Sequence, residues 1–262
     1  AGNMNFMNTV KVKKIDGEYK IVWNSAVIFP ELKDSYKVRV TTLESTRGAI
    51  YDRNDIAIAK DGEVYSVGLV PGKMDDTTDL AKLANLLGIT EETINNSLNA
   101  SYVKEDTFVP LRKISKDEQD LKNELLNIKG ILITNVTARV YPYKEATSLL
   151  TGYVQEDEGK TGLEYAYNDR LKGTDGEEIY IADESENKVK TLAKRDLKNG
   201  ENIKTTIDVT IQQELYNQFK EDPGASVAMN YNTGEVLALV STPAYDANDI
   251  VLGVTNDEWN EL

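Results

Sequence analysis

The sequence contains no cysteine and no histidine among its 262 residues. Without cysteine there is no disulfide framework, no thiolate metal site and no cysteine nucleophile. Without histidine the usual general base, the usual zinc ligand and every Ser-His-Asp triad are excluded. No apolar run approaches the ~20 residues that cross a bilayer, and no signal peptide is recognisable. We therefore expect neither a metal site nor a cofactor.

Basic residues are also fewer than acidic residues. The chain has 30 Lys and Arg residues against 44 Asp and Glu residues, a formal net charge of -14. This balance excludes nucleic acid as a partner, because neutralising phosphates requires a basic surface. Hydrophobic residues at 40% and charged residues at 28% are typical of a soluble globular protein of one to three domains.

The first 30 residues predict a β-hairpin. Apolar residues alternate on both sides of Asp16-Gly17, a pair that favours a tight turn. The second strand is expected to continue through residues 26–29 and to end at Pro30. Because a two-stranded hairpin is only marginally stable, we expect it to complete a sheet with strands further upstream.

Strands are also predicted at residues 38–40, 49–51 and 64–70, with a turn at Asp61-Gly62. From about residue 72 to 130 the apolar spacing becomes helical. A first helix over residues 80–87 is expected to begin at Thr77 or Thr78 and to end at Gly88.

Two further helices are predicted in this insertion, one from Thr90 and one after a capping box at Ser115–Glu118. Later elements are expected as strands at 131–133, 136–141 and 178–181, a helix with Asp208 as N-cap, and a final hairpin of residues 225–229 and 236–240.

The most informative stretch is residues 44–54, which sets two arginines, a glycine and an aspartate among apolar, strand-like residues. It closely resembles the R-G-x-I-x-D-R-N motif of class B penicillin-binding proteins, the cell-wall transpeptidases that β-lactams inhibit. The matching residues are Arg47, Gly48, Asp52, Arg53 and Asn54.

Four more blocks resemble the same family in the expected order. Two belong to the family's non-catalytic pedestal: R-x-Y-P at Arg139, Tyr141 and Pro142 with Gly152-Tyr153 after it, and G-x-x-G-L-E with Gly162 and Glu164. Two belong to the start of the transpeptidase domain: T-I-D…Q with Asp208 and Gln212, and the hairpin block Thr233–Pro243 followed by Tyr245-Asp246.

Within the family the chain is most similar to the low-affinity, methicillin-resistance type. The segments that carry this likeness are Trp23–Pro30 and Glu105–Leu111. The sequence departs from the family at Asp55, where a glycine is usual, and at Leu149, in a stretch where relatives often carry histidine. The turn at Asp55 is therefore expected to differ.

The resemblance implies an α+β fold: an elongated, multi-lobe pedestal with a helical insertion, then the first helix and β-hairpin of a transpeptidase domain. Residues 1–32 are expected to be the C-terminal hairpin of an NTF2-like N-terminal domain. Residues 33–200 are expected to form the dimerisation-type pedestal domain, with its insertion at about 72–130. Residues 201–262 are expected to be the incomplete start of the transpeptidase domain.

The resemblance also implies a parent D,D-transpeptidase that cross-links stem peptides through a serine acyl-enzyme. This chain is expected to end before the catalytic serine and to be inactive. The parent is expected at the extracytoplasmic face of the bacterial plasma membrane, held by an N-terminal helix absent from this chain. Expected partners are the rest of the transpeptidase domain, peptidoglycan, β-lactams, and cell-division or wall-synthesis proteins.

The arginines of these motifs present planar, permanently charged groups, and Asp52 and Glu164 are candidate acceptors. We predict that arginine–carboxylate pairs, above all Arg47 with Glu164, join segments that are distant in sequence. Breaking a buried pair costs ~3–5 kcal/mol, whereas an exposed pair contributes only ~0–1 kcal/mol. Neither interpretation makes these residues catalytic.

Two alternatives remain. The chain could be an enzyme that uses Ser101 or Ser185, each followed by a lysine three residues later, but both serines lie in polar surroundings. Lys160-Thr161-Gly162 matches another catalytic pattern but belongs to the pedestal block. The chain could also be a stand-alone, non-enzymatic wall-binding or scaffolding protein. The final hairpin argues against this, because its apolar strands need partner strands.

Overall fold

The structure is a computed structural model that describes residues 7–254. The chain divides into two compact units, residues 1–46 with 173–200 and residues 47–172 with 201–262. The outer limits of the predicted domains, residues 1 and 262, lie outside the described residues. Strands and helices are mixed in the way that the predicted α+β fold requires.

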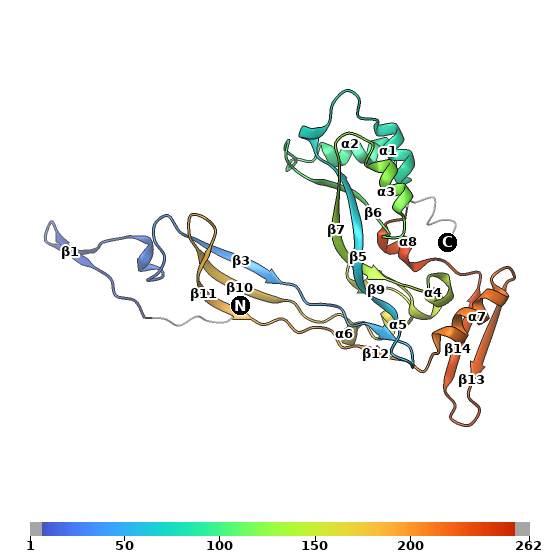
Figure 1. Ribbon diagram of the computed structural model, residues 1–262. Helices are drawn as coiled ribbons and strands as arrows, with labels where there is room; N and C mark the ends of the chain where they lie inside the picture. Colours follow the sequence, from blue (N-terminus) through green and yellow to red (C-terminus); the bar gives the residue numbers. More distant parts are fainter. Residues whose placement is uncertain (1–6, 255–262) are drawn as a thin grey trace. The chain divides into compact units, whose positions relative to one another are not determined.

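The first unit contains the predicted hairpin and a three-stranded antiparallel sheet (Figure 1). The hairpin consists of β1 (Val12–Ile15) and β2 (Glu18–Ile21), and both turn residues, Asp16 and Gly17, have positive φ. The sheet has the order β11–β10–β3, with β3 (Lys37–Leu43), β10 (Gly176–Ala182) and β11 (Lys188–Arg195).

The prediction of a strand over residues 26–29 is wrong. This segment contains instead the short 3-10 helix η1 (Ser25–Val27), in which Ile28 N–H donates to the carbonyl of Ser25. The carboxylate of Asp34 accepts a hydrogen bond from Ser25 N–H at 2.8 Å. That contact provides a partner for a backbone N–H group at the start of the helix.

The second unit is built around the 13-residue strand β5 (Ala57–Leu69). Its first part pairs with β4 (Ile50–Tyr51), which also pairs with β12 (Ile203–Lys204). Its remainder pairs with β6 (Val109–Ile114) and β7 (Ile131–Val140). The turn predicted at Asp61-Gly62 is wrong, because these residues lie inside β5 and face Arg139 and Ala138 in an unbroken ladder.

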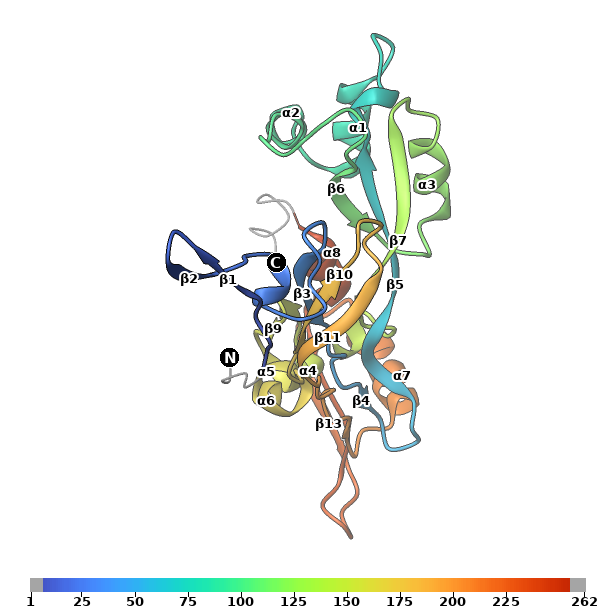
Figure 2. The same cartoon turned by 90° about the vertical axis from the view of Figure 1, so that its left-hand side faces the viewer.

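The insertion contains η2 (Pro71–Lys73), α1 (Leu80–Leu87), α2 (Glu91–Leu98) and α3 (Gln119–Leu125), and it also contains β6. The three α-helices gather at one end of β5 and β7 (Figure 2). Their apolar sides form a core with β5 around Leu69, Leu83, Ile94 and Leu125.

Two predicted helix starts need correction. Helix α1 begins after Asp79, whose side chain accepts from Lys82 N–H, while Thr77 and Thr78 bond to Asp75 in the preceding turn. Helix α3 begins after Glu118, three residues later than the capping box required. The Glu118 carboxylate still accepts from Ser115 N–H at 2.6 Å. The predicted caps at Thr90 and Gly88 are confirmed.

The rest of the second unit consists of elements that follow β7 in the sequence. Short elements follow that strand: α4 (Glu145–Thr151), β8 (Val154–Gln155), β9 (Glu158–Gly159), α5 (Gly162–Ala166) and α6 (Asn168–Leu171). The C-terminal elements are α7 (Val209–Phe219), β13 (Gly224–Met229), β14 (Val236–Thr242) and α8 (Ala247–Leu252). Helix α7 packs on β14, and α8 packs back on β6 and β7 (Figure 1).

Candidate functional site

Three of the motifs meet in one buried group of side chains, here called the motif cluster: Arg47, Asp61, Arg139, Tyr141, Glu164 and Asn168. At its centre the Glu164 side chain is 0% exposed, and the Arg47 and Arg139 side chains are 5% and 3% exposed. The motif cluster therefore lies where an ion pair is poorly screened by solvent.

Each carboxylate oxygen of Glu164 faces a different arginine. Arg47 Nε donates to Glu164 Oε2 at 2.8 Å, and Arg139 Nε donates to Oε1 at 2.7 Å. The Arg47–Glu164 pair that the sequence predicted is thus present, over a sequence separation of 117 residues. The prediction did not include the second arginine on the same carboxylate.

Additional acceptors contact both guanidinium groups, although Arg47 Nη1 is buried without a hydrogen-bond partner. Arg139 Nη1 donates to Asp61 at 3.2 Å and Nη2 donates to the Gly48 carbonyl at 2.9 Å. Arg47 Nη2 donates to the side chain of Asn168 at 2.9 Å. Asp61 and Asn168 carried no sequence signal, since Asp61 was assigned to a turn. Their roles depend on the register of β5 against β7 and on the position of α6.

Tyr141 adds a neutral donor to the motif cluster. Its ring is fully buried, and its hydroxyl lies 3.4 Å from Glu164 Oε1. Burial, followed by the neighbouring Glu164 charge, raises the pKa of Tyr141. The hydroxyl therefore keeps its proton. Pro142, the last residue of the R-x-Y-P block, is exposed and follows the end of β7.

Two motif glycines are required by close backbone contacts. A Cβ on Gly48 would lie 2.0 Å from the carbonyl oxygen of Glu201. Gly162 has φ +57°, and a Cβ there would lie 2.5 Å from the backbone nitrogen of Gly152. Both positions exclude a side chain on steric grounds. Gly162 begins α5, which carries Glu164 into the motif cluster.

Asp52 forms a second buried centre, and it does not pair with an arginine. Its Oδ1 accepts from the N–H groups of Asn54 (2.7 Å) and Ile56 (2.8 Å), and its Oδ2 accepts from Val209 N–H at 3.2 Å. Its expected role as an arginine acceptor is therefore wrong. Instead, it joins the turn after β4 to the first turn of α7.

Other motif residues lie beside Asp52. Asn54 donates to Asp208 Oδ2 at 3.2 Å, and Asp208 is the N-cap of α7, as predicted. Asp55 adopts φ +63°, so this aspartate takes the left-handed conformation that glycine adopts most easily. Arg53 lies apart from both buried centres and approaches Glu235 at 3.6 Å, with both side chains about one-third exposed.

The two serine–lysine patterns lie at exposed positions. Ser101 and Lys104 are both exposed. Ser185 lies in an exposed turn that the Asp183 carboxylate closes, while Lys188 pairs with Glu178 at 2.9 Å. A serine nucleophile would need a base within hydrogen-bond reach, and these contacts provide none.

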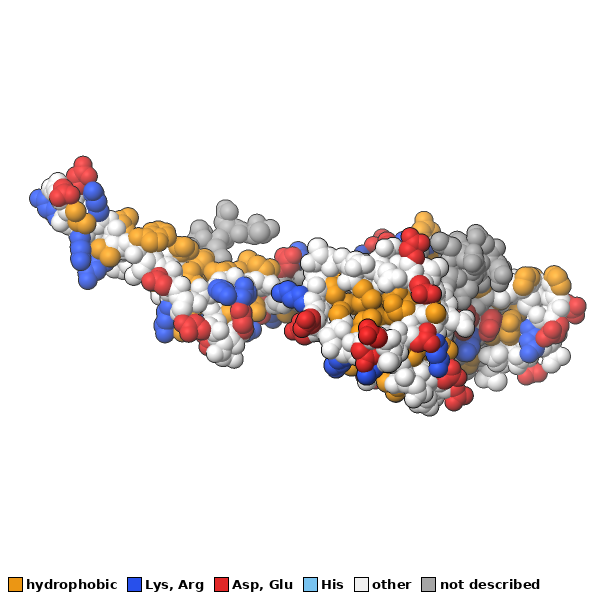
Figure 3. All heavy atoms as spheres, turned by 90° about the horizontal axis from the view of Figure 1, so that it is seen from above, with side chains coloured by type: hydrophobic (Ala, Val, Ile, Leu, Met, Phe, Trp, Pro, Cys, Tyr) orange, Lys and Arg blue, Asp and Glu red, His pale blue; other side chains and the backbone are white. Residues whose placement is uncertain are grey.

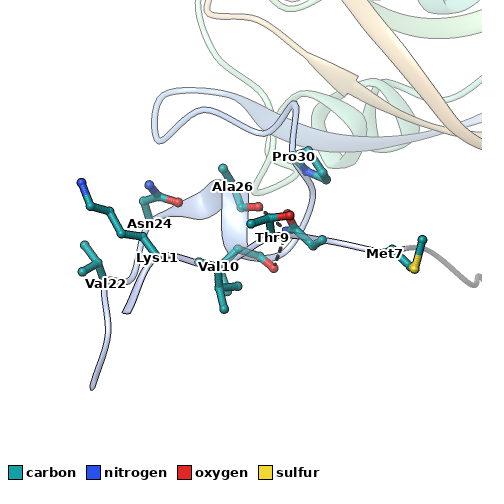
Figure 4. A pocket seen from close by; sticks show the side chains of 10 residues that line it. Met7, Thr9, Val10, Lys11, Val22, Asn24, Ala26 and Pro30 are labelled. Carbon is teal, nitrogen blue, oxygen red and sulfur yellow. Dashed lines mark hydrogen bonds between the residues drawn. The ribbon is translucent and has the colours of Figure 1, made fainter. Parts of the chain in front are cut away.

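The described residues 7–254 offer few other candidate sites. No group of three or more acidic side chains is placed to hold a metal ion, and no helix is long and apolar enough to cross a membrane. A pocket of about 450 Å³ lies beside the first hairpin (Figure 4). Lys11 is the one charged residue of its lining, so the pocket offers no acid–base pair.

Hydrophobic side chains reach the surface on both units (Figure 3). On β3 of the first unit, Val40 is 70% exposed. On the C-terminal hairpin, Val227, Met229 and Leu239 are 54%, 57% and 44% exposed. Val227 and Leu239 are direct cross-strand partners, so these residues form an apolar side of the hairpin.

Comparison with known proteins identifies the family. Residues 42–205 match the family model of the penicillin-binding protein dimerisation domain. The chain therefore belongs to the class B penicillin-binding proteins. It is similar to penicillin-binding protein 3 of Bacillus subtilis (strain 168), with 38% identity over 286 residues that cover 100% of this chain and 42% of that protein.

Two more distant relatives support the same family assignment. Peptidoglycan D,D-transpeptidase MrdA of Acinetobacter baumannii is 26% identical, over 89% of this chain and 38% of the relative. A solved complex between penicillin-binding protein PBP2 and MreC from Helicobacter pylori aligns with a TM-score of 0.59 and 27% identity, over 86% of this chain and 46% of that chain. The chain thus spans less than half the length of each relative.

Proposed function

We propose that this chain is the non-catalytic pedestal portion of a longer peptidoglycan D,D-transpeptidase. The observation that carries the proposal is the motif cluster, in which three pedestal motifs meet in buried ion pairs. The dimerisation-domain match over residues 42–205 supports the same assignment. The proposed domains are residues 1–32, 33–200 and 201–262, as the sequence predicted.

In the longer protein, the proposed reaction is a transpeptidation. A serine hydroxyl attacks the carbonyl of the penultimate D-Ala of a stem peptide, and the terminal D-Ala leaves as an ester forms. The amine of a neighbouring strand then attacks the ester, which forms the cross-link and frees the serine. β-Lactams would acylate the same serine. The pedestal would hold the catalytic domain on the extracytoplasmic side of the membrane.

Three finer assignments belong to this proposal. The likeness of Trp23–Pro30 and Glu105–Leu111 to the methicillin-resistance type supports low β-lactam affinity. The partner bound to the Helicobacter pylori relative supports contact with a cell-wall synthesis protein. The apolar side of the C-terminal hairpin supports a further partner, the remainder of the transpeptidase domain, which would cover Val227 and Leu239.

Labelling with fluorescent penicillin tests the proposal. The purified 262-residue chain is compared with a longer protein that continues to the natural stop codon, each with and without excess unlabelled ampicillin. We expect competable labelling of the longer protein alone. Labelling of neither would favour the non-enzymatic wall-binding or scaffolding protein. Labelling of the short chain would point to Ser101 or Ser185 and would overturn the proposal.

A further inference from the structure

Asn248, on the last helix, holds both backbone groups of the motif residue Tyr141. Tyr141 N–H donates to Asn248 Oδ1 at 2.8 Å, and Asn248 Nδ2 donates to the Tyr141 carbonyl at 2.9 Å. Asp246 Oδ1 accepts from the same Nδ2 at 2.7 Å, which fixes the orientation of the amide. The hydroxyl of the same Tyr141 reaches Glu164, so this contact connects α8 to the motif cluster.

Other contacts also hold the segment around α8: Lys144 Nζ lies 3.8 Å from Asp246 Oδ2, and the Tyr245 ring packs edge-on against Tyr153. The helix has six residues, too few to be stable alone, and its buried residues are Ala247 and Ile250. Apolar contacts attract without specifying direction, whereas two hydrogen bonds to one residue specify both the position and the rotation of the helix. The Asn248 amide is therefore a directional part of this packing.

The preceding hairpin is fastened by a different amide. Gln212 Nε2 donates to the carbonyls of Ala146 (2.7 Å) and Leu239 (2.8 Å), and Gln212 Oε1 accepts from Leu239 N–H at 2.8 Å. Gln212 therefore ties α7 and β14 to α4. Helix α8 follows the hairpin in the sequence, so Asn248 provides a second attachment further along the chain.

We infer that Asn248 is a positioning residue, which fastens the segment after the hairpin to Tyr141 and so holds the catalytic domain in place on the pedestal. This inference rests on the proposed function. It assigns a role in catalysis to a residue that contacts no substrate and that acts through the backbone of Tyr141.

Hydrogen–deuterium exchange tests the attachment in the 262-residue chain. Asn248→Ala removes both bonds to Tyr141, and Asn248→Asp keeps the shape but loses the donor. We expect the amides of Tyr141 and of residues 246–252 to exchange at least about tenfold faster in Asn248→Ala. Asn232→Ala, on the exposed hairpin turn, is the matched control and should change nothing. Unchanged exchange in both Asn248 variants would overturn the attachment.

Acylation kinetics test the positioning role in the longer protein. We expect the maximal rate of fluorescent-penicillin acylation, per folded molecule, to fall by about tenfold in both Asn248 variants, while the control keeps the wild-type rate. Faster exchange with an unchanged acylation rate would refute the positioning role. Absence of labelling in the wild-type longer protein would instead refute the proposed function, and the exchange result would still stand.

Discussion

Replacing Glu164 by glutamine should strongly destabilise the second unit. The substitution preserves shape but removes the charge that lies 2.8 Å and 2.7 Å from two guanidinium groups. Glu164 is 0% exposed, and uncompensated buried charge costs ~3–5 kcal/mol. Asp61, 29% exposed, still pairs with Arg139 in this variant. The unpaired charge of Arg47 should therefore account for most of the lost stability. At about 2–4 °C per kcal/mol, the melting temperature should fall by roughly 6–20 °C.

Thermal unfolding followed by circular dichroism measures this effect. Glu235→Gln is the matched control, because its partner Arg53 is 3.6 Å away and both side chains are about one-third exposed. Its expected cost is ~0–1 kcal/mol. High salt should weaken the Arg53–Glu235 pair much more than the buried pair. Equal melting temperatures for the two variants would refute the claim that the motif cluster stabilises the fold.

Three further outcomes are expected. Asp52→Ala leaves three backbone N–H groups without their acceptor, so chemical denaturation should show a loss of about 3 kcal/mol. Asp208→Ala removes the N-cap of α7 and should cost ~1 kcal/mol by the same measurement. The hydrogen bond with Lys129 lowers the pKa of Asp75 to about 2, so stability that is present above pH ~4 should decrease as the pH falls toward 2. Asp75→Asn should abolish that part of the pH dependence of the melting temperature.

Local patterns predicted those features whose cause is local. Gly88 and Asp208 act as caps because the conformational freedom of glycine and the short side chain of aspartate suffice at helix ends. The Arg47–Glu164 pair followed from motif residues that need a charge partner. The turn predicted at Asp61-Gly62 is absent because ten consecutive residue pairs between β5 and β7 outweigh the turn preference of two residues.

Contacts between a side chain and the backbone of a distant segment could not be predicted. Asp52 was expected to bind an arginine, but the folded chain brings three backbone N–H groups to it first. Asn248 lies in no recognised motif, and its partner is the backbone of Tyr141, which any residue could provide. A sequence pattern cannot identify such a contact, since the partner leaves no side-chain preference.

The length of β5 has a consequence for how the second unit unfolds. Its early residues Ile58 and Ala59 belong to the core that also contains Tyr141 and Val209, and its late residues Val67 and Leu69 belong to the core of the insertion. One continuous strand is therefore shared by both cores. Unfolding of either core would disorder part of β5 and so remove residues that pack in the other core. The second unit should therefore unfold in a single cooperative transition.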